Sequence, residues 1–224
     1  MEQDLINYLA QHITDKRLAL FQKIILNRTR YLTVVLEDIY QSQNASAVLR
    51  SCDCFGIQNV HIIENRNKFD VNPNVSLGAS KWLSLHQYSD QENNTEAALL
   101  KLKSEGYRIV ATTPHKNDID LENFDLDEGK SALVFGTELS GISETVKNNA
   151  DLFLKIPMYG FTESFNISVS VAIILHHLTL KLRNSAVDWK LAKDEQERLM
   201  ITWLKTSIKE GDLIVNEFYR QRNL

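Results

Sequence analysis

Three polar segments of the chain stand out, because the residues around them have the apolar patterns of buried strands and helices. Amide, hydroxyl and carboxylate groups in such segments can bind and orient a ligand. A guanidinium can hold an anion such as phosphate, and because it keeps its proton below about pH 12 it is a poor general base. The three segments and their polar residues are 44–50 (Asn44, Arg50), 135–143 (Glu138) and 156–170 (Ser164, Asn166).

Several common chemistries are excluded by what the chain lacks. It has no Gly-x-Gly-x-x-Gly after a strand and no Walker lysine loop, which are the two commonest phosphate-binding motifs. It has no His-Glu-x-x-His, and its six histidines are scattered. Cys52 and Cys54 lie two residues apart on a predicted helix, so they point in different directions and cannot share a metal ion. We predict reduced cysteines and no metal site.

Strands alternate with helices along most of the chain, which favours an α/β fold with a mostly parallel sheet flanked by helices. In such sheets a ligand binds beyond the carboxyl ends of the strands. The loops at these ends contain Thr112, Gly136 and Pro157, and we expect them to line one pocket. The predicted strands are 31–39, 59–63, 107–112, 131–135 and 152–157, and the predicted helices are one or two within 5–25, then 44–55, 95–105, one from 143, and 167–182; residues 117–128 are predicted to be a surface loop.

Together, in this order and near this spacing, the three polar segments resemble the signature motifs of the SPOUT superfamily of RNA methyltransferases. The branch that methylates ribose 2′-hydroxyls of tRNA is the nearest in pattern. The matching patterns are Asn-x-x-x-x-x-Arg from Asn44, Phe-Gly-x-Glu-x-x-Gly from Phe135, and Ile-Pro-Met from Ile156 followed by Ser-x-Asn-x-Ser from Ser164. One departure is that Ser42-Gln43 stands where the family often has Pro-His, so no role of that histidine carries over.

The resemblance implies a SPOUT fold whose C-terminal part forms a trefoil knot, with S-adenosylmethionine bound by the knot loops. It also implies a homodimer whose site lies near the subunit interface. Ordinary rules of chain topology would argue against a knot, and periodicity gives no sign of one. The residues that the resemblance places around the methyl donor are Thr112, Gly136, Ile156, Met158 and Phe165, and those that it assigns to catalysis are Arg50, Asn44, Glu138, Ser164 and Asn166.

Each candidate also has a purely structural interpretation. Asn44 and Asn166 could be helix N-caps, and Glu138 could accept hydrogen bonds from loop amides. Arg50 lies nearly two helical turns after Asn44 and could form a surface salt bridge. If Arg50 is catalytic, we expect it to bind the phosphate next to the target ribose and to stabilise the developing alkoxide, while the proton leaves to phosphate or water.

The chain divides into a helical N-terminal extension (1–30), a SPOUT methyltransferase domain (31–183) and a helical C-terminal extension (184–224). With 25 Lys+Arg against 29 Asp+Glu the net charge is −4, so RNA must bind a local basic surface. We expect that surface to include four residues of the N-terminal segment: Arg17, Lys23, Arg28 and Arg30.

These extensions resemble those of the branch that acts on guanosine 18 in the tRNA D-loop, which makes tRNA the expected substrate. Three alternatives stay open: methylation of another RNA site in the anticodon loop or in rRNA, a catalytically inactive knotted RNA-binding module, and an α/β enzyme that uses another nucleotide. The most apolar segment, 167–175, is half the length of a membrane span, and the N-terminus has no export signal. We therefore expect a cytoplasmic protein that does not bind membranes.

Overall fold

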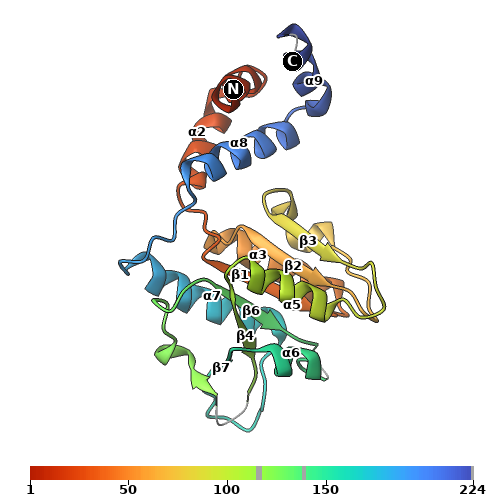
Figure 1. Ribbon diagram of the computed structural model, residues 1–224, viewed down its shortest axis with the longest axis vertical. Coiled ribbons are helices and arrows are strands. Elements are labelled where there is room, and N and C mark those ends of the chain that lie inside the picture. Colours follow the sequence, from red (N-terminus) through yellow and green to blue (C-terminus); the bar gives the residue numbers. More distant parts are fainter. Residues whose placement is uncertain (115–117, 138–139, 223–224) are drawn as a thin grey trace. The chain divides into compact units, whose positions relative to one another are not determined.

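The computed structural model describes residues 1–114, 118–137 and 140–222. Within them the chain forms two compact units, one of Thr29–Trp189 and one that combines Met1–Arg28 with Lys190–Leu224. The larger unit contains the whole β-sheet, and the smaller unit is helical (Figure 1). Arg30, which the sequence analysis grouped with the N-terminal extension, belongs to the unit with the sheet.

The larger unit is built on a seven-stranded sheet in which every adjacent pair of strands is parallel. The predicted α/β class with a parallel sheet flanked by helices is therefore confirmed. Helices cover both faces, as parallel strands require (Figure 1). In sheet order the strands are β3 (Ser84–Tyr88), β2 (Asn59–Ile63), β1 (Leu32–Glu37), β6 (Ser131–Phe135), β4 (Arg108–Thr112), β7 (Leu152–Lys155) and β5 (Ile119–Asp120).

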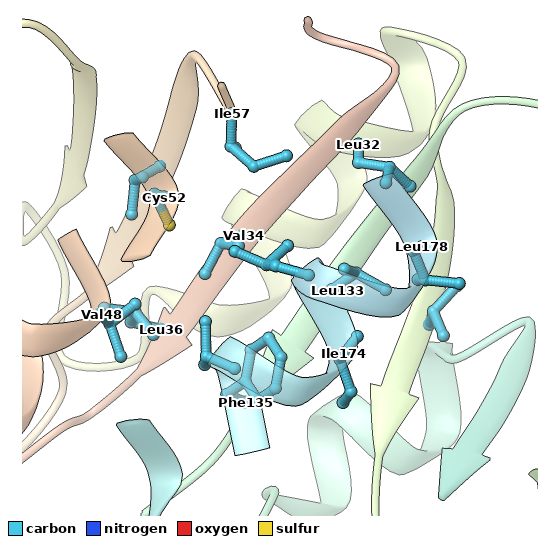
Figure 2. Close-up of a cluster of buried hydrophobic side chains, with 14 of the residues drawn as sticks. Leu32, Val34, Leu36, Val48, Cys52, Ile57, Leu133, Phe135, Ile174 and Leu178 are labelled. Atoms are coloured by element: carbon cyan, nitrogen blue, oxygen red, sulfur yellow. The ribbon is translucent and has the colours of Figure 1, made fainter. Parts of the chain in front are cut away.

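Alternate residues of β1 face opposite sides of the sheet and enter two separate apolar clusters. Leu32, Val34 and Leu36 pack with α3 (Ser42–Phe55) and α7 (Ile167–Arg183), and Figure 2 shows this cluster. Val35 faces the other side, where it packs with α5 (Thr95–Ser104) and α6 (Glu144–Asn149). The face of Leu32, Val34 and Leu36 thus carries α3 and α7, the helices of the first and third polar segments. The face of Val35 carries α6, the helix that follows the second segment.

The predicted helix boundaries agree with the structure where a cap residue is present. Gly56 ends α3 in the left-handed conformation, with φ of 79°. Ser143 and Asn166 accept backbone N–H groups at the N-termini of α6 and α7, as the sequence predicts. For Asn44 the N-cap interpretation is wrong, because α3 begins at Ser42 and leaves Asn44 inside its first turn.

The prediction of a surface loop over 117–128 is also wrong for the part that the structure describes. This segment contains β5 and the short 3-10 helix η2 (Leu121–Asn123). The acidic residues suggested a solvated loop, whereas the apolar residues between them, Leu121, Phe124 and Leu126, are buried in the core. Three further elements were not predicted: α4 (Pro73–Ser76), η1 (Ala79–Lys81) and the edge strand β3.

The smaller unit consists of four helices, α1 (Glu2–Ala10), α2 (Asp15–Ile25), α8 (Lys193–Ser207) and α9 (Gly211–Gln221). The sequence predicts one or two helices within 5–25, and the structure has two, with Thr14 as the N-cap of α2. Helix α8 packs against the other three helices. Its buried residues include Leu199, Trp203 and Leu204.

Candidate functional site

Three loops at the carboxyl ends of neighbouring strands β6, β4 and β7 enclose a cavity of about 310 Å³. The cavity is within the size range of small-molecule sites, and it lies where open α/β sheets bind ligands. Hydroxyl groups and apolar side chains both line it, which suits a ligand with polar and apolar parts. The lining residues are Thr112, Thr113, Pro114, Phe135, Gly136, Thr137, Ser140, Gly141, Leu154, Ile156, Met158, Ser164, Phe165, Ile167, Ser170 and Ile174.

All five residues expected around the methyl donor line this cavity: Thr112, Gly136, Ile156, Met158 and Phe165. Ser164, expected to help form the catalytic site, lines it as well. Ser170 and Ile174, which also line the cavity, were not predicted as site residues from the sequence. Their spacing from Ile167, three and seven residues on, places all three on one face of α7. That helical periodicity was the available signal.

The loop after β6 is shaped by a close approach of its own backbone. Thr137 and Gly141 exchange two N–H···O hydrogen bonds of 3.0 Å each, which closes the loop into a tight turn. A Cβ atom on Gly136 would collide with the carbonyl group of Gly141, so only glycine fits there. Glu138 lies outside the residues that the structure describes.

Asn166 joins the third polar segment to the first. Its Oδ1 accepts hydrogen bonds from the backbone N–H and the hydroxyl of Ser168, at 2.8 and 2.6 Å, which caps α7. Its Nδ2 donates to Oδ1 of Asn44 over 3.1 Å. The Nδ2 of Asn44 in turn donates to Oε1 of Gln41, the residue directly before α3. The two asparagines therefore fix the start of α7 against the start of α3.

Arg50 is exposed on α3 and is not among the described residues that line the cavity. It follows Asn44 by six residues, or about 9 Å along a helix axis. The surface-salt-bridge interpretation finds no support among the ion pairs of the described residues, none of which includes Arg50. The guanidinium is thus accessible to an external anion.

The four basic residues of the N-terminal segment differ in their surroundings. Arg17 and Lys23 are exposed on α2. Arg28 is only 2% exposed, and its guanidinium lies over the indole ring of Trp203, 5.3 Å from the centroid. That position favours a packing role for Arg28. Arg30 is half-buried in the other unit and donates to Oδ1 of Asn59 over 3.1 Å.

No cluster of three or more His, Cys, Asp or Glu side chains in the described ranges is arranged to hold a metal ion. Likewise, none of the described helices combines the length and the apolar character that crossing a membrane demands.

The parallel sheet, the closed glycine loop after β6 and the capped helix after β7 define an α/β protein with a ligand cavity at the carboxyl edge of its sheet. Residues 31–176 match the SpoU rRNA methylase family, and the chain belongs to that family. The match begins just before β1 and ends within α7, so it covers all three polar segments.

Named relatives share nearly the whole length of the chain. The tRNA (guanosine(18)-2'-O)-methyltransferase of Borreliella burgdorferi is 46% identical over 94% of this chain and 94% of its own. The enzyme of the same name from Thermus thermophilus is 29% identical over 86% of this chain and 97% of its own. Among solved structures, an Aquifex aeolicus TrmH/SpoU tRNA modifying enzyme aligns with a TM-score of 0.76 at 28% identity, covering 87% of this chain and 98% of that one.

Proposed function

We propose that this protein is an S-adenosylmethionine-dependent tRNA (guanosine(18)-2′-O)-methyltransferase, which methylates a ribose 2′-hydroxyl in the tRNA D-loop. The observation that carries the proposal is the convergence of the loops after β4, β6 and β7 on one cavity. The relatives with this name add the substrate, since the similarity to the Borreliella enzyme covers 94% of the chain and so is not confined to the sheet unit. Because the proposed substrate is tRNA, we also propose a cytoplasmic location for the protein.

The cavity fits S-adenosylmethionine by the chemistry of its lining. Ile156, Leu154 and Ile174 offer an apolar surface for an adenine ring, and the hydroxyls of Thr112 and Ser164 can serve polar groups of the ribose or the amino acid. Gly136 adds no side chain, which leaves the cavity wall there to the backbone. When bound, the donor supplies an electrophilic methyl group on a sulfonium.

The protein's own contribution to the reaction is placement and charge. A ribose hydroxyl is a weak nucleophile, and Arg50 holds the adjacent phosphate and stabilises the alkoxide that develops on the 2′-oxygen. The proton leaves to phosphate or water, because a guanidinium does not accept it. Asn44, Asn166, Ser164 and Glu138 help to form the catalytic site and orient the loops around the reacting groups.

We also propose that two copies of the chain form a homodimer through the surface around α7. A groove of about 600 Å³ there is largely apolar, and Tyr159 at its rim and the neighbouring Phe161 are fully exposed in the single chain. Large exposed aromatic residues of this kind mark protein interfaces. The groove is lined by Phe55, Leu121, Glu122, Ile156, Pro157, Tyr159, Ala172, Ile173, His176 and His177.

The trefoil knot is proposed on the order of the strands. The chain leaves β4, reaches β5 at the far edge of the sheet and returns to β6, while β7 lies between β4 and β5. The 3-10 helix η2 within this connection contacts α7, and Lys181 Nζ on α7 donates to the carbonyl of Phe124 over 2.6 Å. We propose on this basis that α7 leaves β7 through the connection between β4 and β6, which is the threading that a knot requires.

For tRNA binding, we propose that the four-helix unit of Met1–Arg28 and Lys190–Leu224 supplies exposed cations, among them Arg17 and Lys23, and that Arg30 adds to them from the sheet unit. Contacts of this kind weaken steeply as salt rises. An inactive RNA-binding module would retain tRNA without binding the donor. An enzyme for another nucleotide would show no salt-sensitive binding of tRNA.

Methyl transfer to unmodified tRNA tests the proposal. The protein is incubated with S-adenosylmethionine and a tRNA transcript, and the modified nucleoside is mapped. We expect 2′-O-methylguanosine at position 18 and none in a transcript with a deoxyguanosine there. A methyl group at an anticodon position would support the alternative site in tRNA, and a parallel incubation with rRNA tests the alternative site there. Donor binding without transfer to either RNA would contradict the proposal.

A further inference from the structure

A buried carboxylate on the face of the sheet opposite α7 is absent from the motifs discussed above. Glu37 is the last residue of β1 and is only 3% exposed. An isolated buried carboxylate is costly, so its hydrogen bonds must offset the loss of water. Its neighbours therefore indicate what this residue is for.

Both carboxylate oxygens of Glu37 are used, and their donors come from two different helices. Oε1 accepts the hydroxyl of Thr95 and the hydroxyl of Ser143, each over 2.7 Å. Oε2 accepts the backbone N–H of Ser143 over 2.9 Å. Thr95 is the first residue of α5 and Ser143 is the N-cap of α6, so the charge also lies at the positive ends of two helices.

Ser143 is the point at which the loop that closes the cavity rejoins regular structure. The loop turns back on itself at Thr137 and Gly141, and Ile142 then enters the core beside α5 and α6. Ser143 follows at once, bound to Glu37 by both its backbone and its side chain. The carboxylate is thus a direct link between the central strand of the sheet and the end of the cavity loop.

The other side of the carboxylate is held as firmly. Thr95 accepts a hydrogen bond from Asn65 Nδ2 over 2.9 Å while it donates to Glu37. The backbone N–H of Asn65 donates in turn to Oδ1 of Asp38, which takes the left-handed conformation with φ of 56°. These bonds fix the position of Glu37, so displacement of the loop would break several of them together.

From this geometry we infer that Glu37 is a positioning residue that, through Ser143, holds Gly136, Thr137 and Gly141 in the positions needed to bind the methyl donor. The inference rests on the proposed function for the identity of the donor. It does not require Glu37 to touch the donor or the RNA. Its effect should therefore appear in donor affinity and in loop order, with a smaller effect on turnover once the donor is bound.

Glu37→Gln is the informative variant, because one acceptor oxygen then faces three donors. Ser143 Oγ already accepts from Val146 and Thr95 Oγ1 from Asn65. A hydroxyl that turned to accept from the Gln amide would use its second lone pair and would leave its own proton without the carboxylate that now accepts it. Thr33→Val is the matched control. Thr33 lies on the same strand and is fully buried, and its hydroxyl donates to the carbonyl of Asn59 over 2.8 Å at the end of β1 remote from the loop.

Two measurements on the full-length protein test the inference. Amide hydrogen exchange without ligand should be about tenfold faster at Thr137 and Gly141 in Glu37→Gln, and unchanged in Thr33→Val at equal global stability. The KM for S-adenosylmethionine should rise about tenfold in Glu37→Gln with kcat within about threefold of the parent. Ser143→Ala should add little to Glu37→Gln, because both remove the same link.

The outcomes separate this inference from the proposed function. Equal loop exchange in Glu37→Gln and in the parent would overturn the inference, whatever the donor is. An active parent protein whose KM is unchanged by Glu37→Gln would overturn it as well and would leave the methyltransferase proposal intact. A parent protein that binds no donor, with loop exchange still faster in Glu37→Gln, would contradict only the proposed function.

Discussion

At the scale of single residues, the prediction with the largest expected effect concerns Arg50. If its guanidinium binds the phosphate beside the target ribose, its two-pronged geometry matters as well as its charge. We therefore expect Arg50→Lys to lower kcat by about 100-fold with little change in donor affinity. Single-turnover kinetics with saturating donor and tRNA measure this.

Arg198→Lys is the control for this experiment. Arg198 is an exposed arginine on α8 that already pairs with Asp194 over 2.6 Å, so the change should leave turnover near the parent value. Near-normal turnover of Arg50→Lys would mean that charge alone suffices at this position. The geometric role assigned to the guanidinium would then be wrong.

The residues of the site differ in how far their surroundings follow from the sequence. The position of Ser143 and Asn166 as helix caps could be predicted, since each is a capping residue directly before a helical pattern. The hydrogen bond between Asn166 and Asn44 could not, because it joins residues 122 positions apart. Glu37 was missed for a related reason: its position at the end of a buried strand is visible, but its partners Thr95 and Ser143 come from distant segments.

At the scale of elements, the loop after β6 requires a residue without a side chain at position 136, and a substitution that adds one carbon atom tests this requirement. In Gly136→Ala the new Cβ would collide with the Gly141 carbonyl, so the closed turn would have to open. We expect donor affinity to fall by at least about tenfold, by analogy with other strained backbone substitutions. Isothermal titration calorimetry with S-adenosylmethionine gives the affinity directly.

Gly160→Ala is the matched substitution, since a Cβ there meets no atom within 4 Å. It should leave donor affinity and melting temperature close to those of the parent. Equal donor affinity in Gly136→Ala and Gly160→Ala would show that the closed turn is not needed for binding. The loop would then have to be placed outside the donor site.

Local patterns predicted elements well where burial and chain order agree, and poorly at the edges of the sheet. Every residue of β1 and β6 is buried and most of them are apolar, as expected for parallel strands covered on both faces. The edge strand β3 reads Ser-Leu-His-Gln-Tyr and carries no such signal, while β5 has only two residues within an acidic segment. At both edges tertiary pairing with one neighbour decides the conformation, and a local pattern cannot show it.

At the scale of the whole molecule, the composition excludes bulk attraction to RNA but does not locate the cations. The net charge of −4 is the same wherever the arginines lie. The structure separates Arg28, which packs on Trp203, from Arg17 and Lys23, which are exposed. Periodicity could not make that distinction, because Arg28 follows the last residues of a helix and its partner lies 175 positions further along the chain.

The stability of the molecule should depend on pH through a histidine pair between β2, β3 and α5. His61 is 1% exposed and stacks on His86, with ring centroids 4.6 Å apart, and its Nδ1 lies 2.9 Å from the hydroxyl of Tyr88. Burial lowers the pKa of His61 from 6.5 to about 3, and the nearby His86 and Lys101 contribute in the same direction. Burial also lowers the pKa of His86, whereas Glu105, the residue after α5, acts in the opposite sense.

Because the folded pKa of His61 lies below the unfolded value, the unfolded chain binds the proton more tightly. The stabilisation is therefore complete above about pH 6.5 and is lost as the pH falls from there toward about 3, at roughly 1.4 kcal/mol per pH unit for one proton. Urea unfolding between pH 8 and pH 4 measures the slope. The amide of Gln in His61→Gln can still bind Tyr88 but does not titrate, so the slope of unfolding free energy against pH should be shallower by about 1.4 kcal/mol per pH unit. The control is His12→Gln, at an exposed position on the smaller unit, which should keep the slope of the parent. Identical slopes in His61→Gln and the parent would show that His61 is not the group that resists protonation.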